Sequence, residues 1–242
     1  MFRLTDIVVP ICVTDKSYID RYNPLLPKSF RDPIFKSMTN RKTIGDISLL
    51  GGHTALDFVN TVDSRGERWG PDFLNSFSDL VTWARRLDVI SQEEQDVLLS
   101  RATKSPAEAQ TELDQAKKLR EVLHRIFLSE SDGALVADQD LALLTSVAKR
   151  AQSRRSLQQH AGGIRWHEQA AEELDIVAER VAWLAAELLT SKGERRPVRE
   201  CQGQNCGWLF LDVSRSGYRR WCSDKTCGSH SRVRKFRAVR AG

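Results

Sequence analysis

The chain has no run of apolar residues approaching the roughly 20 that a membrane-spanning helix needs. We also expect no secretory leader, because the opening MFRLTDIVVPICV carries one early basic residue and an apolar stretch broken by Pro10. We therefore expect a cytoplasmic protein without a membrane partner. In the reducing cytoplasm, paired cysteines are more typical of metal sites than of disulfides.

Recognisable catalytic motifs are also lacking. His167-Glu168 begins like the HExxH motif of zinc proteases, but residue 171 is alanine, so the second histidine is absent. No phosphate-cradling loop and no nucleophile–base pair stands out. We predict that the chain is not an enzyme. The alternative is an enzyme with a pocket near Asp57, Asn60 and Asp63. These residues and His53, which follows the Gly51-Gly52 pair, could line such a pocket, but a capped turn packing into the helical body is the favoured interpretation.

Only five cysteines occur among the 242 residues, and four of them form two pairs near the C-terminus. The pattern is Cys201-x4-Cys206, then fifteen residues, then Cys222-x4-Cys227. Each pair can turn tightly enough to present two thiolates to one ion, which predicts a single zinc site of four sulfurs. Four sulfurs complete a tetrahedral shell, so we expect the zinc to be structural.

Most of the chain lacks net positive charge, which is concentrated at its end. Residues 193–242 contain 12 Lys and Arg against 4 Asp and Glu, whereas the remainder contains 25 against 28. An acidic body joined to a basic segment is the asymmetry expected when one part of a protein binds a polyanion.

The basic segment also has a readable structural pattern. Two cysteine knuckles flank residues 208–213 and 218–221, which are predicted to pair as a β-hairpin, and residues 198–200 can enter as a further short strand. A helix is expected after Gly228. This order predicts a treble-clef-like zinc finger over residues 193–242. A module of about fifty residues buries little apolar surface, so bound zinc would supply much of its folding energy.

Arginines and lysines on this small scaffold could neutralise phosphates, and an arginine-bearing helix can enter the major groove of DNA. Double-stranded DNA is therefore the predicted partner, with RNA or a protein as alternatives. Aromatic residues 208, 210, 218 and 221 are expected to form the hairpin core. The predicted nucleic-acid contacts are Arg215, Arg219, Arg220, Arg232, Arg234, Lys235, Arg237 and Arg240.

The preceding part of the chain, residues 48–192, is predicted to be mainly α-helical. Residues 49–61 are compatible with a strand or a short helix, and residues 162–166 with a turn and strand. The clearest stripe has apolar residues at 174, 177, 181, 184 and 188. Helix starts are predicted at Ser78 (ending near Leu87), at Ser91 with Glu94 (ending near Leu99), at Ser105-Pro106, and at Asp138 or Asp140. Residues 1–47 lack periodicity and are predicted to be a poorly ordered extension.

Two segments resemble known families. The run Cys201-x4-Cys206-Gly207-Trp208-Leu209-Phe210-Leu211-Asp212, with Ser214-Arg215, Arg219-Arg220-Trp221-Cys222-Ser223 and Cys227-Gly228, resembles the CGNR zinc finger. The run Leu50-Gly51-Gly52-His53-Thr54-Ala55-Leu56-Asp57-Phe58-Val59-Asn60-Thr61 resembles the opening of the ABATE domain, which precedes this finger in bacterial proteins described as stress-induced transcription regulators. The resemblance covers roughly residues 48–240.

The resemblance implies a DNA-binding regulator whose helical domain senses a small-molecule effector or forms a homodimer. One departure is clear. The family is named for Cys-Gly-Asn-Arg, and the equivalent stretch here is Cys227-Gly228-Ser229-His230. The four cysteines are intact, so we expect the fold to persist. Any contact made by the family's arginine would be altered here, and His230 would make it pH-dependent.

Overall fold

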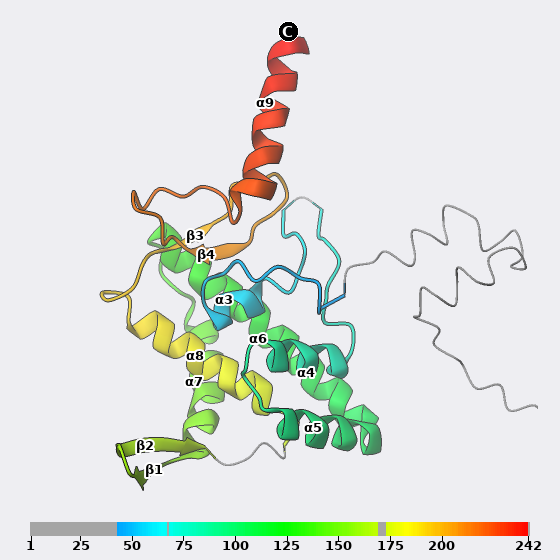
Figure 1. Ribbon diagram of the computed structural model, residues 1–242, viewed down its shortest axis with the longest axis vertical. Coiled ribbons are helices and arrows are strands. Elements are labelled where there is room, and N and C mark those ends of the chain that lie inside the picture. The colour runs from blue at the N-terminus through cyan, green and yellow to red at the C-terminus, as the bar shows by residue number, and fades with distance from the viewer. Residues whose placement is uncertain (1–42, 67, 169–172, 242) are drawn as a thin grey trace, which may run out of the picture. The chain divides into compact units, whose positions relative to one another are not determined.

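A computed structural model describes residues 43–66, 68–168 and 173–241 of the chain (Figure 1). The predicted N-terminal extension therefore falls almost entirely outside the described residues. Its last five residues are described and pack onto the helical body. Ile44 and Ile47 are buried, and the Arg86 guanidinium donates hydrogen bonds to both of their carbonyl oxygens, at 3.2 and 2.7 Å.

The body is built from helices, as predicted. The described residues contain α3 (Thr54–Val59), α4 (Phe77–Arg86), α5 (Gln92–Lys104), α6 (Pro106–Asp132), α7 (Asp138–Ser153) and α8 (Ile176–Thr190). The long helix α6 contacts α3, α4, α5, α7 and α8, so its buried face forms the centre of the core. Residues 49–61 thus contain a short helix, one of the two structures that the sequence allowed.

The start of α5 agrees with the prediction from sequence, and the start of α4 differs from it. The capping box at Ser91 and Glu94 is confirmed, although α5 continues past Leu99 to Lys104. Helix α4 begins earlier than predicted, with Ser76 and not Ser78 as its cap. The reason is reciprocal bonding: Ser76 accepts from the Asp79 amide, and Asp79 accepts from the Ser76 amide. A cap at Ser78 would place apolar Val81 at the reciprocating position.

The start of α6 and the apolar stripe of α8 lie where the sequence predicts them, and a glycine ends α6. Pro106 occupies the first turn of α6, and Gly133 ends the helix in the left-handed conformation (φ 70°). Ser105 makes no side-chain capping bond, so proline rather than serine marks this start. Of the predicted apolar stripe of α8, Val177, Val181 and Leu188 are buried.

A hairpin lies outside this core. Strands β1 (Arg155–His160) and β2 (Gly163–Glu168) pair antiparallel, with Leu157 opposite Trp166. The turn and strand expected at residues 162–166 are therefore present. Leu157, Ile164 and Trp166 are all exposed. None of the helices in the described part of the chain is both long and apolar enough to cross a bilayer.

The C-terminal part contains β3 (Val198–Glu200), β4 (Leu209–Leu211), the short π-helix η3 (Asp224–Gly228) and α9 (Ser229–Ala241). Together with the cysteine cluster, these elements confirm a helical protein carrying a small zinc-finger module. Figure 1 shows α9 projecting away from the remaining elements.

The predicted strand pairing within the finger is wrong. β4 pairs with β3, with Phe210 opposite Arg199, and not with residues 218–221, which form no strand. The reason is that buried Asp212 accepts a hydrogen bond from the Arg219 amide at 2.8 Å, so this amide is not available for a ladder. As a result Tyr218 is 79% exposed instead of lying in a hairpin core, while Trp208 and Phe210 are buried as expected.

Candidate zinc centre and its junction with the helical body

The four cysteines converge on one point. Their sulfur atoms all lie within 4.8 Å of one another. The Cys222 sulfur lies 3.8 Å from that of Cys206 and 3.7 Å from that of Cys227. A tetrahedron with Zn–S bonds of about 2.3 Å requires sulfur–sulfur separations of about 3.8 Å. Cys201, Cys206, Cys222 and Cys227 are therefore positioned to bind one zinc ion.

The charge chemistry of this cluster also suits a cation. Hydrogen bonds from the Cys206 and Cys222 thiols lower the pKa of Cys201 to about 2, and its sulfur also accepts from the amides of Cys222 and Gly203. The pKa values of the other three thiols are raised, for Cys206 and Cys222 chiefly by the hydrogen bond to Cys201. Four thiolates gather in one place only when a metal ion balances their charge.

Backbone conformation explains how the first knuckle closes. Asn205 (φ 62°) and Gly207 (φ 66°) both adopt the left-handed region. A Cβ on Gly203 would lie 2.8 Å from the Cys227 sulfur, so only glycine lets the two knuckles approach this closely. The first knuckle thus depends on three small or turn-forming residues, two between its ligands and one directly after Cys206.

The finger is joined to the body by hydrogen bonds between buried groups. The Asn60 side chain, at the end of α3, donates to the Leu209 carbonyl at 2.8 Å and accepts from the Leu209 amide at 3.0 Å. The Trp208 indole N–H donates to the Val62 carbonyl at 2.7 Å. The Leu211 amide donates to the Gly51 carbonyl at 2.9 Å. Residues 43–241 accordingly belong to one compact unit.

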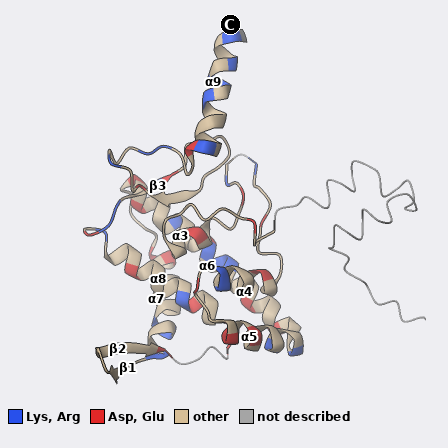
Figure 2. Ribbon diagram, viewed as in Figure 1, with Lys and Arg blue, Asp and Glu red and all other residues tan. Residues whose placement is uncertain are grey.

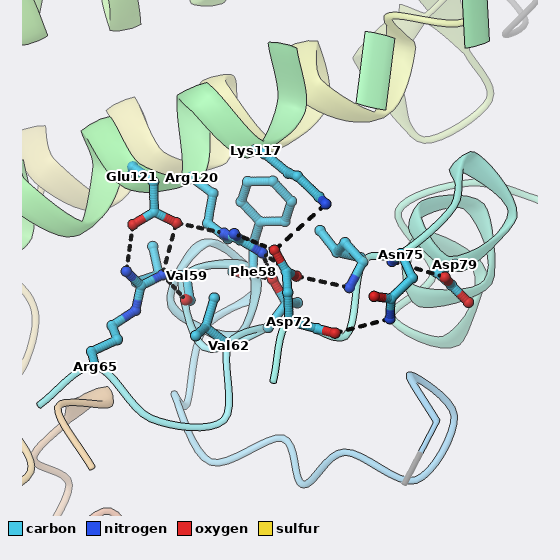
Figure 3. Close-up of polar contacts among 12 residues, drawn as sticks. Phe58, Val59, Val62, Arg65, Asp72, Asn75, Asp79, Lys117, Arg120 and Glu121 are labelled. Carbon is cyan, nitrogen blue, oxygen red and sulfur yellow. Dashed lines mark hydrogen bonds and ion pairs between the residues drawn. The ribbon is translucent and has the colours of Figure 1, made fainter. Parts of the chain in front are cut away.

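Beneath this junction lies a network of charged side chains, drawn in Figure 3. Arg120 makes a two-pronged ion pair with Asp72, both bonds at 2.8 Å, and donates to the Thr61 hydroxyl at 3.1 Å. Arg65 pairs with Glu121 at 2.5 Å and donates to the Val59 carbonyl. Burial alone would raise the pKa of Asp72, but the hydrogen bonds and charge of Arg120, with smaller contributions from the Leu74 amide and Lys117, together outweigh it, so that pKa is lowered. This network ties the segment after α3 to α6.

The four predicted pocket residues are placed as follows. Asp57 is buried and accepts from the Gly51 amide at 2.8 Å, and burial raises its pKa to about 6. His53 caps α3 by accepting from the Ala55 amide, and burial lowers its pKa. Asn60 is buried against Leu209, and Asp63 is exposed. Three of the four thus hold backbone groups of the α3 segment or of β4.

The predicted nucleic-acid residues fall into two groups. Arg219 is engaged internally: it stacks on Phe210 at 4.3 Å and donates to the carbonyls of Trp221 and Cys222. Arg220 and Arg234 donate to Gln202 and Gln204 of the first knuckle, and Arg232 pairs with Asp224. The exposed members for which no polar partner is found among the described residues are Arg215, Lys235, Arg237 and Arg240.

Helix α9 carries Lys235, Arg237 and Arg240, three of these four exposed cations. Its 13 residues include Arg232, Arg234, Lys235, Arg237 and Arg240 and no acidic residue, as Figure 2 shows along the projecting helix. His230 is exposed at its start and lines a hollow of about 150 Å³ together with Gln204, Cys227 and Arg234. The four-sulfur cluster does not include it.

A helical body bearing a four-cysteine module of this geometry defines a zinc-finger protein. Comparison with protein families identifies which one. Residues 52–192 match ABATE, described as "Putative stress-induced transcription regulator", and residues 197–240 match the CGNR zinc finger. The chain belongs to the ABATE family and carries a CGNR finger. Neither family is an enzyme class. No curated protein was found to match the chain.

Two residues that organise this site were not singled out in the sequence. Asp212 is fully buried and accepts from Ser214, Arg199 and the Arg219 amide. An acid inside the apolar run Trp208–Val213 was a usable signal, because buried carboxylates require donors. The role of Asn205 could not be predicted from neighbouring residues, because its hydrogen-bond partners lie about 140 residues earlier in the chain.

Proposed function

We propose that this protein is a transcription regulator whose zinc finger binds double-stranded DNA through α9. The observation that carries the proposal is the charge of that helix, with five cations and no acid on an element that projects from the finger. A 13-residue helix is about 20 Å long and about 10–12 Å wide, dimensions that match a major groove about 12 Å wide.

The zinc centre has a structural part in this proposal. Its four sulfurs leave no coordination position for water or substrate, so the ion would hold the two knuckles and the base of α9 in place. Phosphate contacts by Arg237, Lys235 and Arg240 would release counterions. The affinity for DNA should then fall steeply as salt concentration rises.

The test uses zinc-loaded full-length protein and selection of bound fragments from genomic DNA, followed by affinity measurements on the selected duplex. Arg237→Ala should weaken binding, while Arg165→Ala, on the exposed hairpin β1–β2, serves as the matched arginine control. Binding of the selected duplex that does not depend on salt would overturn the proposal. Tighter binding of single-stranded RNA would favour the RNA alternative, and binding of neither nucleic acid would favour a protein partner.

For the helical body we propose a regulatory part, either sensing of a small molecule or formation of a homodimer. The support is the family description as a stress-induced regulator. Sedimentation of the purified protein over a range of concentrations tests dimerisation directly. A single monomeric species at every concentration would rule out dimerisation. Sensing of a small molecule would then be the proposed role of the helical body.

A further inference from the structure

The segment between α3 and α4 lies against the first cysteine knuckle. Its residues 63–66 and 68–70 are called the body loop here. The Asn205 side chain makes three hydrogen bonds with it: Nδ2 donates to Ser64 Oγ at 3.1 Å and to the Arg68 carbonyl at 2.6 Å, and Oδ1 accepts from the Arg68 amide at 2.7 Å. The Arg65 amide donates to the Cys206 carbonyl at 2.9 Å.

This attachment is close and is fixed from both sides. A Cβ on Gly66 would lie 2.6 Å from Asn205 Cα, so loop and knuckle are in direct backbone contact. On its other side the loop is held by Arg65, whose guanidinium pairs with Glu121 of α6. The body loop therefore has a defined position relative to the zinc centre.

The same knuckle also contacts α9. Gln204, the residue before Asn205, accepts a hydrogen bond from Arg234 of α9 at 2.6 Å. Adjacent Cα atoms are about 3.8 Å apart, so the body loop and α9 flank a single turn of the chain. In the view of Figure 1, the segment after α3 rises to the level of the base of α9.

Arg68 is an exposed, positively charged residue of this loop. Its amide and carbonyl are both bound by Asn205, but its side chain is exposed and makes no ion pair or hydrogen bond with any residue that the structure describes. Next to it, Trp69 is 54% exposed and stacks under Arg65 at 5.1 Å. A main chain held by Asn205, presenting a guanidinium that has no partner among the described residues, is the arrangement expected of a phosphate contact.

We propose that the body loop forms part of the DNA-binding surface, with Arg68 binding a backbone phosphate beside the groove that α9 enters. This inference rests on the proposed DNA binding by the finger. It adds a contact from the ABATE region, outside residues 197–240 that match the zinc finger. When a helix lies in a DNA groove, protein contacts to the sugar-phosphate backbone on either side of that groove fix the register of the helix on the duplex.

The experiment compares Arg68→Ala and Arg68→Lys with the wild type on a duplex selected by the wild-type protein, with Arg165→Ala as control. Arg68→Ala should lower the affinity about 3- to 10-fold, equally for different duplex sequences, and reduce the slope of log affinity against log salt by about 0.9. Arg68→Lys should retain most of the affinity, because it keeps the charge.

A second variant tests the anchoring. Asn205→Gly removes the amide side chain but tolerates the left-handed backbone, so zinc content should stay at one ion per chain. Its DNA affinity should fall about as far as that of Arg68→Ala, and the double variant should be no weaker than either single one.

The outcomes separate the two proposals. A wild-type protein that binds no duplex would overturn the proposed function. A wild-type protein that binds DNA, with Arg68→Ala indistinguishable from Arg165→Ala, would overturn the role of the body loop alone. Unchanged binding by Asn205→Gly beside a weakened Arg68→Ala would contradict the anchoring by the knuckle.

Discussion

Asn60 and Leu209, 149 residues apart in the chain, form a closed pair of hydrogen bonds in which one side-chain amide serves both backbone groups of a buried β4 residue. Both residues are fully buried, so water cannot replace either bond. Asn60→Ala leaves a buried N–H and a buried C=O without partners. We expect this variant to lose about 2–4 kcal/mol of unfolding free energy.

Urea unfolding followed by circular dichroism measures this loss. Gln158→Ala is the matched control, because Gln158 is an exposed amide on β1. The control should change the unfolding free energy by less than about 0.5 kcal/mol. An Asn60→Ala protein as stable as the control would show that the junction contributes little to the fold.

The Arg120–Asp72 ion pair leads to a second prediction. The Arg120 side chain is only 3% exposed. Its removal leaves Asp72 with the Leu74 amide at 2.9 Å and, as its ion pair, the weaker 3.6 Å contact to Lys117 (Figure 3). Arg120→Met should therefore cost about 3 kcal/mol, the usual result of breaking a buried pair from one side. The double variant Arg120→Met with Asp72→Asn should recover part of that loss, and a strictly additive double variant would contradict the coupling of the two residues.

The zinc ligands and the junction between finger and body show how far the sequence could predict the structure. The zinc ligands follow from local spacing, and the helical body follows from periodicity and capping, both of which are short-range signals. The junction between finger and body could not be predicted from short-range signals, because Asn60 and Asn205 each bind backbone groups more than 130 residues away. A polar residue in an apolar segment indicates that a partner exists, but its identity depends on the tertiary fold.

The error in the finger has a similar cause. Residues 218–221 have the composition of a strand, yet the Arg219 amide donates to the buried Asp212 carboxylate at 2.8 Å instead of to a neighbouring strand. Satisfying a buried charge is worth more than one ladder bond, so the side chain determines the local backbone. Strand propensity alone carries no information about this competition.

Asp57 gives a prediction about pH. Burial raises its pKa to about 6 in the folded protein, above the usual value of 3.8, despite hydrogen bonds from the Gly51 and Leu50 amides. A raised carboxyl pKa means that the folded state binds the proton more tightly, so this residue's contribution to stability is present at low pH and lost as pH rises through about 6. Between about pH 5 and about pH 8, the loss should be about 1 kcal/mol.

Asp57→Asn removes this titration. The stability difference between variant and wild type, measured by urea unfolding at each pH, should therefore shift in favour of the variant by about 1 kcal/mol from about pH 5 to about pH 8. Because both proteins are measured at the same pH, the pH dependence of zinc binding cancels. A difference independent of pH would show that the pKa of Asp57 is not raised.

Removal of zinc should destabilise the helical body as well as the finger. Leu209 and Phe210 of β4 are fully buried in the same hydrophobic core as Phe58 and Trp83, so the finger cannot unfold without exposing part of that core. Cys222→Ser, or chelation of the wild-type protein, should lower the melting temperature of the whole unit by about 10 °C or more, given that each kcal/mol shifts it by about 2–4 °C at this size. The circular dichroism signal of the helices should show one transition, displaced to lower temperature.

Cys12→Ser is the control for this prediction. It leaves the four-cysteine cluster intact and should melt like the wild type. If chelation instead produced a separate early transition with the main one unmoved, the finger would be an independent folding unit, and the hydrogen bonds at Asn60 and Trp208 would contribute nothing to its coupling with the body.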